Sequence, residues 1–174
     1  YLFLDAISYE YSWLNSDLMK NLSEIKQNSL NFHNHYSITN NTGWNFSCLL
    51  SGLTSTLTGI MGKKQDFRNN KYGYIQSVLK KNNIPSYFYS TCNMKKHSPQ
   101  YDPKDVLGFN EFKSFGPSLA DYKVLAKVIN QKYIDNVKKL HKSKNYLLFL
   151  HYIDTHAPFE TPLNKVSKKE FPEI

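Results

Sequence analysis

The chain has 174 residues, enough for one domain with its own core, and 40% of them are hydrophobic while 21% are charged. This composition is typical of a soluble globular protein and excludes a disordered chain, and no apolar run reaches the roughly 20 residues of a bilayer-spanning helix. The net charge of +8 suits an anionic partner, but the lysines are scattered in pairs and no aromatic-plus-basic motif indicates nucleic-acid binding.

The amino-terminal quarter begins with an apolar run, YLFLD, at residues 1–5. This run predicts a buried strand with Asp5 at its carboxyl end. Residues 16–29 carry a Ser16 cap and apolar positions at helical spacing, which predicts a helix. The chain opens on the apolar run without a Met, and no signal peptide is recognisable, so we expect it to be part of a longer protein.

The middle of the chain continues the alternation of strands and helices. Residues 30–38, LNFHNHYSI, alternate in polarity and predict a second strand. Residues 43–53, GWNFSCLLSGL, predict a short helix closed by Gly52. An amphipathic helix is expected at 72–83 and a further strand at 84–91.

The last part of the chain contains a long connection, a long helix and an apolar strand. Residues 92–117 are rich in Pro and Gly and predict an irregular connection. An apolar stripe predicts a helix over about 119–140. Residues 145–154, NYLLFLHYID, predict a strand without a solvated face, and the tail 163–174 predicts little structure.

This alternation predicts an α/β domain with a mainly parallel sheet. Ligands of such sheets gather beyond the carboxyl ends of the strands. Asp5 and the HYIDTH group at 151–156 both lie at predicted carboxyl ends. If the two strands are neighbours, an acid and two imidazoles share one edge of the sheet.

Thr42 directly precedes the helix predicted at 43–53, and two roles are open for it. It is either the N-cap, which accepts a hydrogen bond from a backbone N–H, or a nucleophile at a helix N-terminus. In the second role, free N–H groups and the helix dipole favour a bound phosphate or sulfate. To act as a nucleophile, the Thr42 hydroxyl needs a metal or a base that favours its deprotonation. Asp5 is a candidate ligand of such a metal, and the alternative is that Asp5 caps the turn after its strand.

The histidines and cysteines point less directly to chemistry. His151, Asp154 and His156 form an H-x-x-D-x-H pattern that does not match a helical zinc pair, so we expect an imidazole that donates to a substrate oxygen. His151 is alternatively a packed strand histidine. We interpret His33 and His35 as strand or surface residues. Cys48 is expected to be a small buried side chain, and a disulfide between Cys48 and Cys92 remains open.

Five segments in this order resemble motifs of the sulfatase-type branch of the alkaline phosphatase-like superfamily, which includes phosphoethanolamine and phosphoglycerol transferases. FLDAIS is similar to the opening LDxxR strand, LNFHNHYSI to the next strand, and TGWNFSCLLSG to the nucleophile segment. GFNEF is similar to GFDxF, and NYLLFLHYIDTHAPFETP to the late strand and loop. The resemblance covers nearly the whole chain and implies a three-layer α/β/α fold.

The resemblance also implies the site residues. Thr42 would be the nucleophile, Asp5 and Thr42 would contact a divalent metal ion (Zn, Mn or Ca), and His156 would stabilise the substrate or leaving group. The substrate-binding residues would be His151, Asp154, Lys96 and His97, the last two from the segment NMKKH. The partner implied is an anionic phosphate- or sulfate-ester substrate, lipid- or glycan-linked in some relatives, and not nucleic acid.

The nucleophile segment departs from the sulfatase pattern. Sulfatases convert Cys or Ser to formylglycine within C/S-x-P-x-R, whereas this chain has Thr42, with Trp44 and Phe46 in place of Pro and Arg. Threonine cannot become formylglycine, so the resemblance implies phosphoryl transfer through an unmodified threonine. A sulfuric ester hydrolase and a catalytically inactive binding module of the same fold are the alternatives.

By the same resemblance, residues 1–174 are the N-terminal part of the catalytic domain, and further metal ligands are expected beyond Ile174. The fragment alone is then expected to bind metal poorly and to be inactive. The resemblance places such proteins on the periplasmic or extracytoplasmic face of a bacterial inner membrane. Membrane contact would occur only through segments outside this chain.

Overall fold

The computed structural model describes residues 1–7, 9, 20–60, 67, 70–92, 103–114, 129–131 and 145–153. Within these ranges, no helix combines the length and apolar character needed to cross a membrane.

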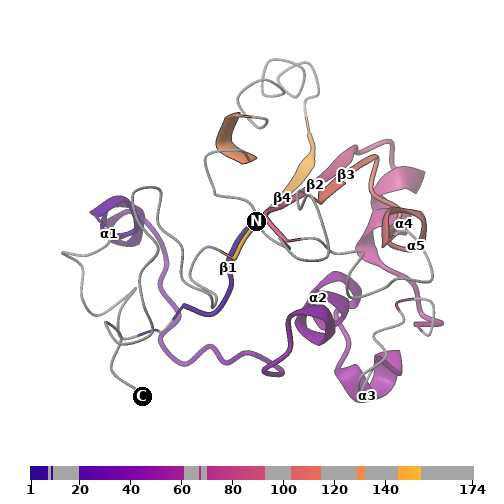
Figure 1. The fold of residues 1–174 in the computed structure, drawn as a ribbon, viewed down its shortest axis with the longest axis horizontal. Coiled ribbons are helices and arrows are strands. Elements are labelled where there is room, and N and C mark those ends of the chain that lie inside the picture. Colours follow the sequence, from indigo (N-terminus) through magenta and orange to yellow (C-terminus); the bar gives the residue numbers. More distant parts are fainter. Residues whose placement is uncertain are drawn as a thin grey trace.

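A four-stranded sheet organises the chain (Figure 1). Its strands are β1 (Leu2–Leu4), β2 (Ser86–Ser90), β3 (Glu111–Ser114) and β4 (Leu147–Tyr152). They are ordered β1-β4-β2-β3, and all three pairings are parallel. The predicted α/β fold with a parallel sheet is therefore confirmed, and the strands before Asp5 and His151 are neighbours.

One row of residues crosses all four strands in register. Phe3 pairs with His151, His151 with Ser90, and Ser90 with Ser114. Side chains of a parallel sheet alternate between its faces, so the members of this row share one face. Asp5 comes two residues after Phe3, at the carboxyl edge that this row marks.

Helix α2 (Thr42–Ser51) packs on that face. Its Phe46 ring lies 4.9 Å from Phe3, 5.5 Å from Phe88 and 5.7 Å from Phe149, measured between centroids. These rings belong to three strands, so one side chain joins the helix to most of the sheet. Gly52 ends α2 in the left-handed conformation, as its position predicted (φ 71°).

The opposite face of the sheet is also covered. The neighbours of Tyr89 in sequence point toward α2, so Tyr89 points to the opposite face, and its side chain is fully buried there. The hydroxyl of Tyr152 donates to the side-chain oxygen of Asn130 at 2.6 Å, and residues 129–131 are helical. Tyr152 follows His151 and so faces away from α2. A helical segment on each side of the sheet gives the three-layer arrangement.

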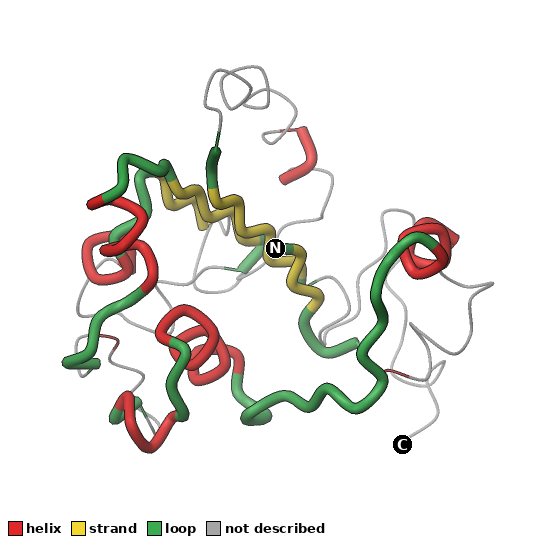
Figure 2. Tube along the Cα trace, turned by 180° about the vertical axis from the view of Figure 1, so that it is seen from behind, coloured by secondary structure: helices red, strands yellow, loops and turns green. Residues whose placement is uncertain are grey.

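The other helices are short. They are α1 (Lys20–Gln27), α3 (Ser55–Thr58), α4 (Ile75–Lys81) and α5 (Pro103–Leu107). Helix α1 has no buried residue, and Figures 1 and 2 both show it apart from the sheet, at the far end of the connection that leads to α2. The helices predicted within 16–29 and 72–83 are confirmed, although 16–19 lies outside the described residues.

The strand predicted at 30–38 is wrong. Its Phe32 side chain is 73% exposed, and Leu30, Tyr36 and Ile38 are exposed as well. No strand among the described residues pairs with this segment, which is a loop. Alternating polarity favours a strand only where a neighbouring strand pairs with its backbone and a core covers its apolar side chains.

The prediction of an irregular connection over 92–117 is partly wrong, because it contains α5 and β3. Pro103 starts α5, a position that suits proline because the missing N–H has no helical partner there. Gly108 ends the helix with φ 74°, and β3 then pairs with β2. Most of the helix predicted at 119–140 and the whole tail at 163–174 lie outside the described residues.

The aromatic core and the exposed loop give a matched pair of substitutions. Phe88 is 1% exposed and stacks on Phe112 and Phe149, so Phe88→Ala is expected to lower the free energy of unfolding by about 3–5 kcal/mol. Phe32→Ala removes an exposed ring and is expected to change it by less than about 0.5 kcal/mol. Urea unfolding monitored by circular dichroism measures both, and a loss for Phe32→Ala equal to that for Phe88→Ala would contradict the exposed placement.

Candidate active site

Asp5 lies directly beyond the carboxyl end of β1. Its backbone N–H donates to the carbonyl of Tyr152 at 2.9 Å, which extends the pairing with β4 by one residue. Ala6 then turns the chain with φ 54°, in the left-handed region that costs a non-glycine residue about 1–2 kcal/mol. The ladder and the turn together place the Asp5 carboxylate at the edge of the sheet.

Asn41, and not Thr42, is the N-cap of α2. The side-chain oxygen of Asn41 accepts hydrogen bonds from the N–H groups of Gly43 (3.0 Å) and Trp44 (3.3 Å). The N-cap interpretation of Thr42 is therefore wrong. The same bonds occupy two of the amides that we expected to be free for an anion, so an anion at this helix end would have to replace the Asn41 side chain at those amides.

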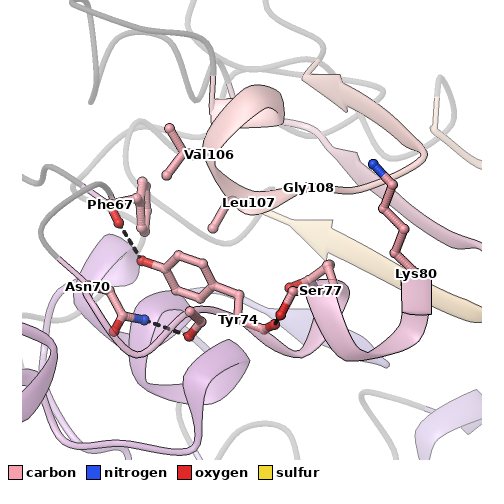
Figure 3. Close-up of a pocket in the computed structure, with 10 residues that line it drawn as sticks. Phe67, Asn70, Tyr74, Ser77, Lys80, Val106, Leu107 and Gly108 are labelled. Atoms are coloured by element: carbon pink, nitrogen blue, oxygen red, sulfur yellow. Dashed lines mark hydrogen bonds between the residues drawn. The ribbon is translucent and has the colours of Figure 1, made fainter. Parts of the chain in front are cut away.

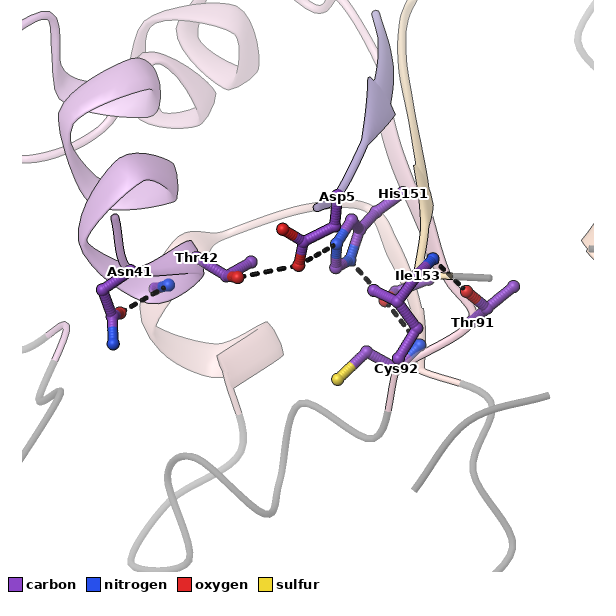
Figure 4. Close-up of polar contacts among 9 residues, drawn as sticks. Asp5, Asn41, Thr42, Thr91, Cys92, His151 and Ile153 are labelled. Atoms are coloured by element: carbon purple, nitrogen blue, oxygen red, sulfur yellow. Dashed lines mark hydrogen bonds and ion pairs between the residues drawn. The ribbon is translucent and has the colours of Figure 1, made fainter. Parts of the chain in front are cut away.

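Because Asn41 caps the helix, the Thr42 hydroxyl is available for another partner. It donates to Oδ2 of Asp5 at 2.7 Å, across 37 positions of sequence (Figure 4). Both side chains are only half-buried, and the Asp5 side chain retains 17% of its exposure. The two residues that the sequence proposed for the centre of a site are therefore in contact and reachable from solvent.

His151 lies behind Asp5, inside the protein. Its ring is fully buried and meets the rings of Phe3 and Phe46 edge to face, with centroids at 5.4 Å and 4.9 Å. Nε2 of His151 is 3.5 Å from Oδ2 of Asp5, and Nδ1 is 2.8 Å from the hydroxyl of Ser90. The interpretation of His151 as a packed strand histidine fits this burial, and the ring is at the same time a direct neighbour of Asp5.

Further hydrogen bonds tie the ends of β2 and β4 together. The Thr91 N–H donates to the His151 carbonyl at 3.0 Å, and the Ile153 N–H donates to the Thr91 hydroxyl at 2.8 Å (Figure 4). The Cys92 N–H donates to the Ser90 hydroxyl at 3.0 Å. These bonds satisfy backbone groups where the strands end, and they restrict the movement of His151.

The side chains of the two cysteines lie inside the protein. Cys48 and Cys92 are both buried thiols, and the disulfide between them that the sequence left open does not form. Burial raises the pKa of the Cys48 thiol, which disfavours the thiolate that a nucleophile requires. Cys48 is a small buried side chain of α2, as predicted, and Thr42 is the residue of this helix that faces Asp5.

The remaining predicted site residues, His156, Asp154, Lys96 and His97, lie outside the described residues. Sequence reasoning missed Ser90 and Asn41. A serine at the carboxyl end of an apolar strand was a usable signal for Ser90, since that edge was already expected to carry the ligand. His33 is a surface residue whose Nδ1 lies 2.7 Å from the Tyr9 hydroxyl.

The Asp5–Thr42 pair offers a carboxylate and a hydroxyl oxygen to a cation. Carboxylate and hydroxyl oxygens suit a divalent metal ion, so the donor chemistry fits in kind. Within the described ranges no group of three or more His, Cys, Asp or Glu side chains is placed to hold a metal. The buried Nε2 of His151 is turned toward the Asp5 carboxylate and away from solvent, so it is not presented to a cation at the open side of Asp5.

A separate cavity of about 380 Å³ lies between α4 and the end of α5, where Val106, Leu107 and Gly108 line it (Figure 3). None of Asp5, Thr42 and His151 lines it. Its Tyr74 hydroxyl already donates to the Phe67 carbonyl at 2.8 Å. The amide of Gln76 has no hydrogen-bond partner among the described residues, but its atoms are inaccessible, so a ligand in the cavity would not reach them.

The capping geometry predicts the effect of a single substitution. Asn41→Ala removes the acceptor of two amide protons and is expected to lower the free energy of unfolding by about 1 kcal/mol. Asn34→Ala, at an exposed asparagine of the preceding loop, serves as the control, with a change below about 0.5 kcal/mol. Thermal unfolding of the two variants measures the difference, and equal stability would argue against Asn41 as the cap.

Comparison with known proteins adds one finding to this geometry. A protein-family model described as Sulfatase matches residues 1–173. Searches of curated proteins and of solved structures gave no significant match. Because the family match spans nearly all of the chain and the parallel α/β sheet agrees with it, the chain belongs to the sulfatase family, whose domain indicates hydrolase or transferase chemistry on sulfate or phosphate esters.

Proposed function

We propose that this protein is a metal-dependent phosphotransferase or phosphohydrolase that acts on phosphate esters or diesters through Thr42. The observation that carries the proposal is the 2.7 Å hydrogen bond from the Thr42 hydroxyl to Oδ2 of Asp5. It joins the start of a helix to the carboxyl end of a strand, where ligands of parallel sheets gather. The substrate is an anionic ester, which suits the net charge of +8.

The identity of the nucleophile favours phosphoryl over sulfuryl transfer. Threonine is a secondary alcohol and cannot be oxidised to the aldehyde of formylglycine, so it would act as a hydroxyl. Phe46, which replaces the arginine of the sulfatase pattern, is buried against the sheet and so serves packing. These features support a covalent phosphothreonine intermediate within the family's ester chemistry.

In the first step, Oγ1 of Thr42 forms a bond to phosphorus, and the bond from phosphorus to the leaving oxygen breaks. The hydroxyl proton moves along the existing hydrogen bond toward Oδ2 of Asp5. The positive end of the α2 dipole stabilises negative charge that develops at Thr42. In the second step, the oxygen of water or of an acceptor alcohol forms a bond to phosphorus, and the bond from phosphorus to Oγ1 of Thr42 breaks. Oγ1 takes back the proton held by Asp5, and the attacking hydroxyl releases its own proton to solvent, which completes hydrolysis or transfer.

Asp5 and Thr42 would hold the divalent ion from the sheet edge, together with ligands from other parts of the protein. When bound, such an ion neutralises charge on the phosphoryl oxygens and favours the deprotonated hydroxyl. His156 is assigned by family resemblance to stabilise the substrate or leaving group. Asp154, Lys96 and His97 are assigned in the same way to the substrate.

The nucleophile is tested with the full-length protein, a divalent metal and a chromogenic phosphodiester. We expect intact-mass analysis to show a phosphoryl-linked adduct that Thr42→Ala abolishes and that Thr42→Ser, which keeps the hydroxyl, retains at a reduced rate. Turnover of a sulfate ester without a threonine adduct would replace this proposal by sulfatase chemistry. Metal binding without adduct or turnover of either ester would indicate an inactive module.

The metal ligand is tested by the binding of Zn²⁺ and Mn²⁺ to the same protein. Asp5→Asn removes a charged oxygen ligand and is expected to weaken metal affinity by about 100-fold or more, measured by calorimetry. Asp105→Asn, at an exposed acid in the first turn of α5, is the control and should leave the affinity within about twofold. Equal affinities for the two variants would exclude Asp5 as a ligand.

A further inference from the structure

We propose that Ser90 and His151 act as a buried pair of positioning residues, which hold the Asp5 carboxylate in the orientation that accepts the Thr42 hydroxyl. The catalytic consequence of this pair rests on the function proposed above, whereas its geometry does not. The pair follows from the hydrogen positions that the surrounding contacts require. Ser90 lies next to His151 in register on the neighbouring strand.

The hydroxyl of Ser90 has one proton, and the structure leaves one place for it. Its oxygen accepts the Cys92 N–H at 3.0 Å, and its side chain is fully buried. In the part of the chain that the structure describes, the only side-chain or backbone acceptor within reach of this proton is Nδ1 of His151, at 2.8 Å. Buried hydroxyl protons are rarely left without an acceptor, so Ser90 donates to Nδ1.

The direction of this hydrogen bond determines the position of the ring proton of His151. With Nδ1 as the acceptor, the proton lies on Nε2, which is 3.5 Å from Oδ2 of Asp5. Nε2 is buried and forms no hydrogen bond within the described ranges, so its N–H attracts the carboxylate without completing a short bond. The opposite tautomer would turn a lone pair toward a carboxylate oxygen and leave the Ser90 proton unsatisfied.

The ring is also prevented from turning. Phe3 and Phe46 meet it edge to face, and the interplanar angle with Phe46 is 86°. Oδ2 of Asp5 therefore lies between a fixed N–H behind it and the Thr42 hydroxyl in front of it (Figure 4). Since the ring is fully buried, His151 acts on Asp5 and does not contact the substrate, which differs from the substrate-binding role that resemblance implied.

The first test observes the ring itself. Long-range ¹H–¹⁵N correlation spectra of the ¹⁵N-labelled full-length protein in alkaline buffer, assigned with His151→Gln, show which ring nitrogen carries hydrogen. We expect the Nε2–H tautomer in the wild type and a mixture of tautomers in Ser90→Ala. Ser114→Ala is the control, because it removes a serine hydroxyl from the same row whose partner is the Cys92 carbonyl, at 2.6 Å.

The second test measures the consequence for Asp5. Ser90→Ala is expected to weaken Zn²⁺ binding and lower kcat by about 10- to 100-fold each, while Ser114→Ala stays within about twofold. His151→Gln places an amide N–H where Nε2 was, and His151→Asn places one where Nδ1 was. We expect His151→Gln to retain more Zn²⁺ affinity and kcat than His151→Asn. If His151 had a purely structural role, the two variants would lose affinity and kcat to the same extent, in proportion to the stability that each loses in unfolding measurements.

The outcomes separate this inference from the proposed function. An Nδ1–H tautomer in the wild type overturns the positioning pair, whatever the protein catalyses. Equal Zn²⁺ affinity in Ser90→Ala and Ser114→Ala also overturns it. A wild-type protein that binds no Zn²⁺ and forms no threonine adduct contradicts the proposed function, while the spectra still decide the orientation of His151.

Discussion

The packing of Phe46 against the sheet is the contact on which the arrangement of the site depends. This ring belongs to α2 and meets Phe3 of β1, Phe88 of β2 and both Phe149 and His151 of β4. It lies one helical turn after Thr42, so it sets how closely the start of α2 approaches the carboxyl edge of the sheet. This anchor helps to hold Thr42 against an acid that lies 37 positions earlier in the chain.

The same contact gives a physical reason for the unusual nucleophile segment. Trp44 and Phe46 replace the proline and arginine of the sulfatase pattern, and both pack against the hydrophobic core. The segment thus stabilises the helix start through apolar burial, where a sulfatase would place a charged side chain. Asn41 caps the helix and leaves Thr42 free to face Asp5. The loss of the sulfatase signature is therefore compatible with a complete and ordered Thr42–Asp5 contact.

Polar groups at the carboxyl edge form a connected set and not a scatter of single residues. Ser90 contacts His151, His151 faces Asp5, and Asp5 accepts from Thr42. Burial of such groups is unfavourable unless they have partners, and here each has one that lies on a different strand or helix. The set also explains why a fully buried histidine occurs between the rings of Phe3 and Phe46. Its polar atoms support a carboxylate that remains reachable from solvent.

The sequence by itself determined the features that depend on neighbouring residues: the apolar strand before Asp5, the helix closed by Gly52, the apolar strand at His151, and the α/β class. Local patterns suffice there because strand and helix periodicities and glycine caps act within a few residues. Tertiary structure decided the rest. It made Asn41 the cap and brought Ser90 to His151. It also left 30–38 without a partner strand among the residues that the structure describes, and it made 111–114 a strand. Strand pairing and side-chain contacts join residues far apart in the chain, and no local pattern carries that information.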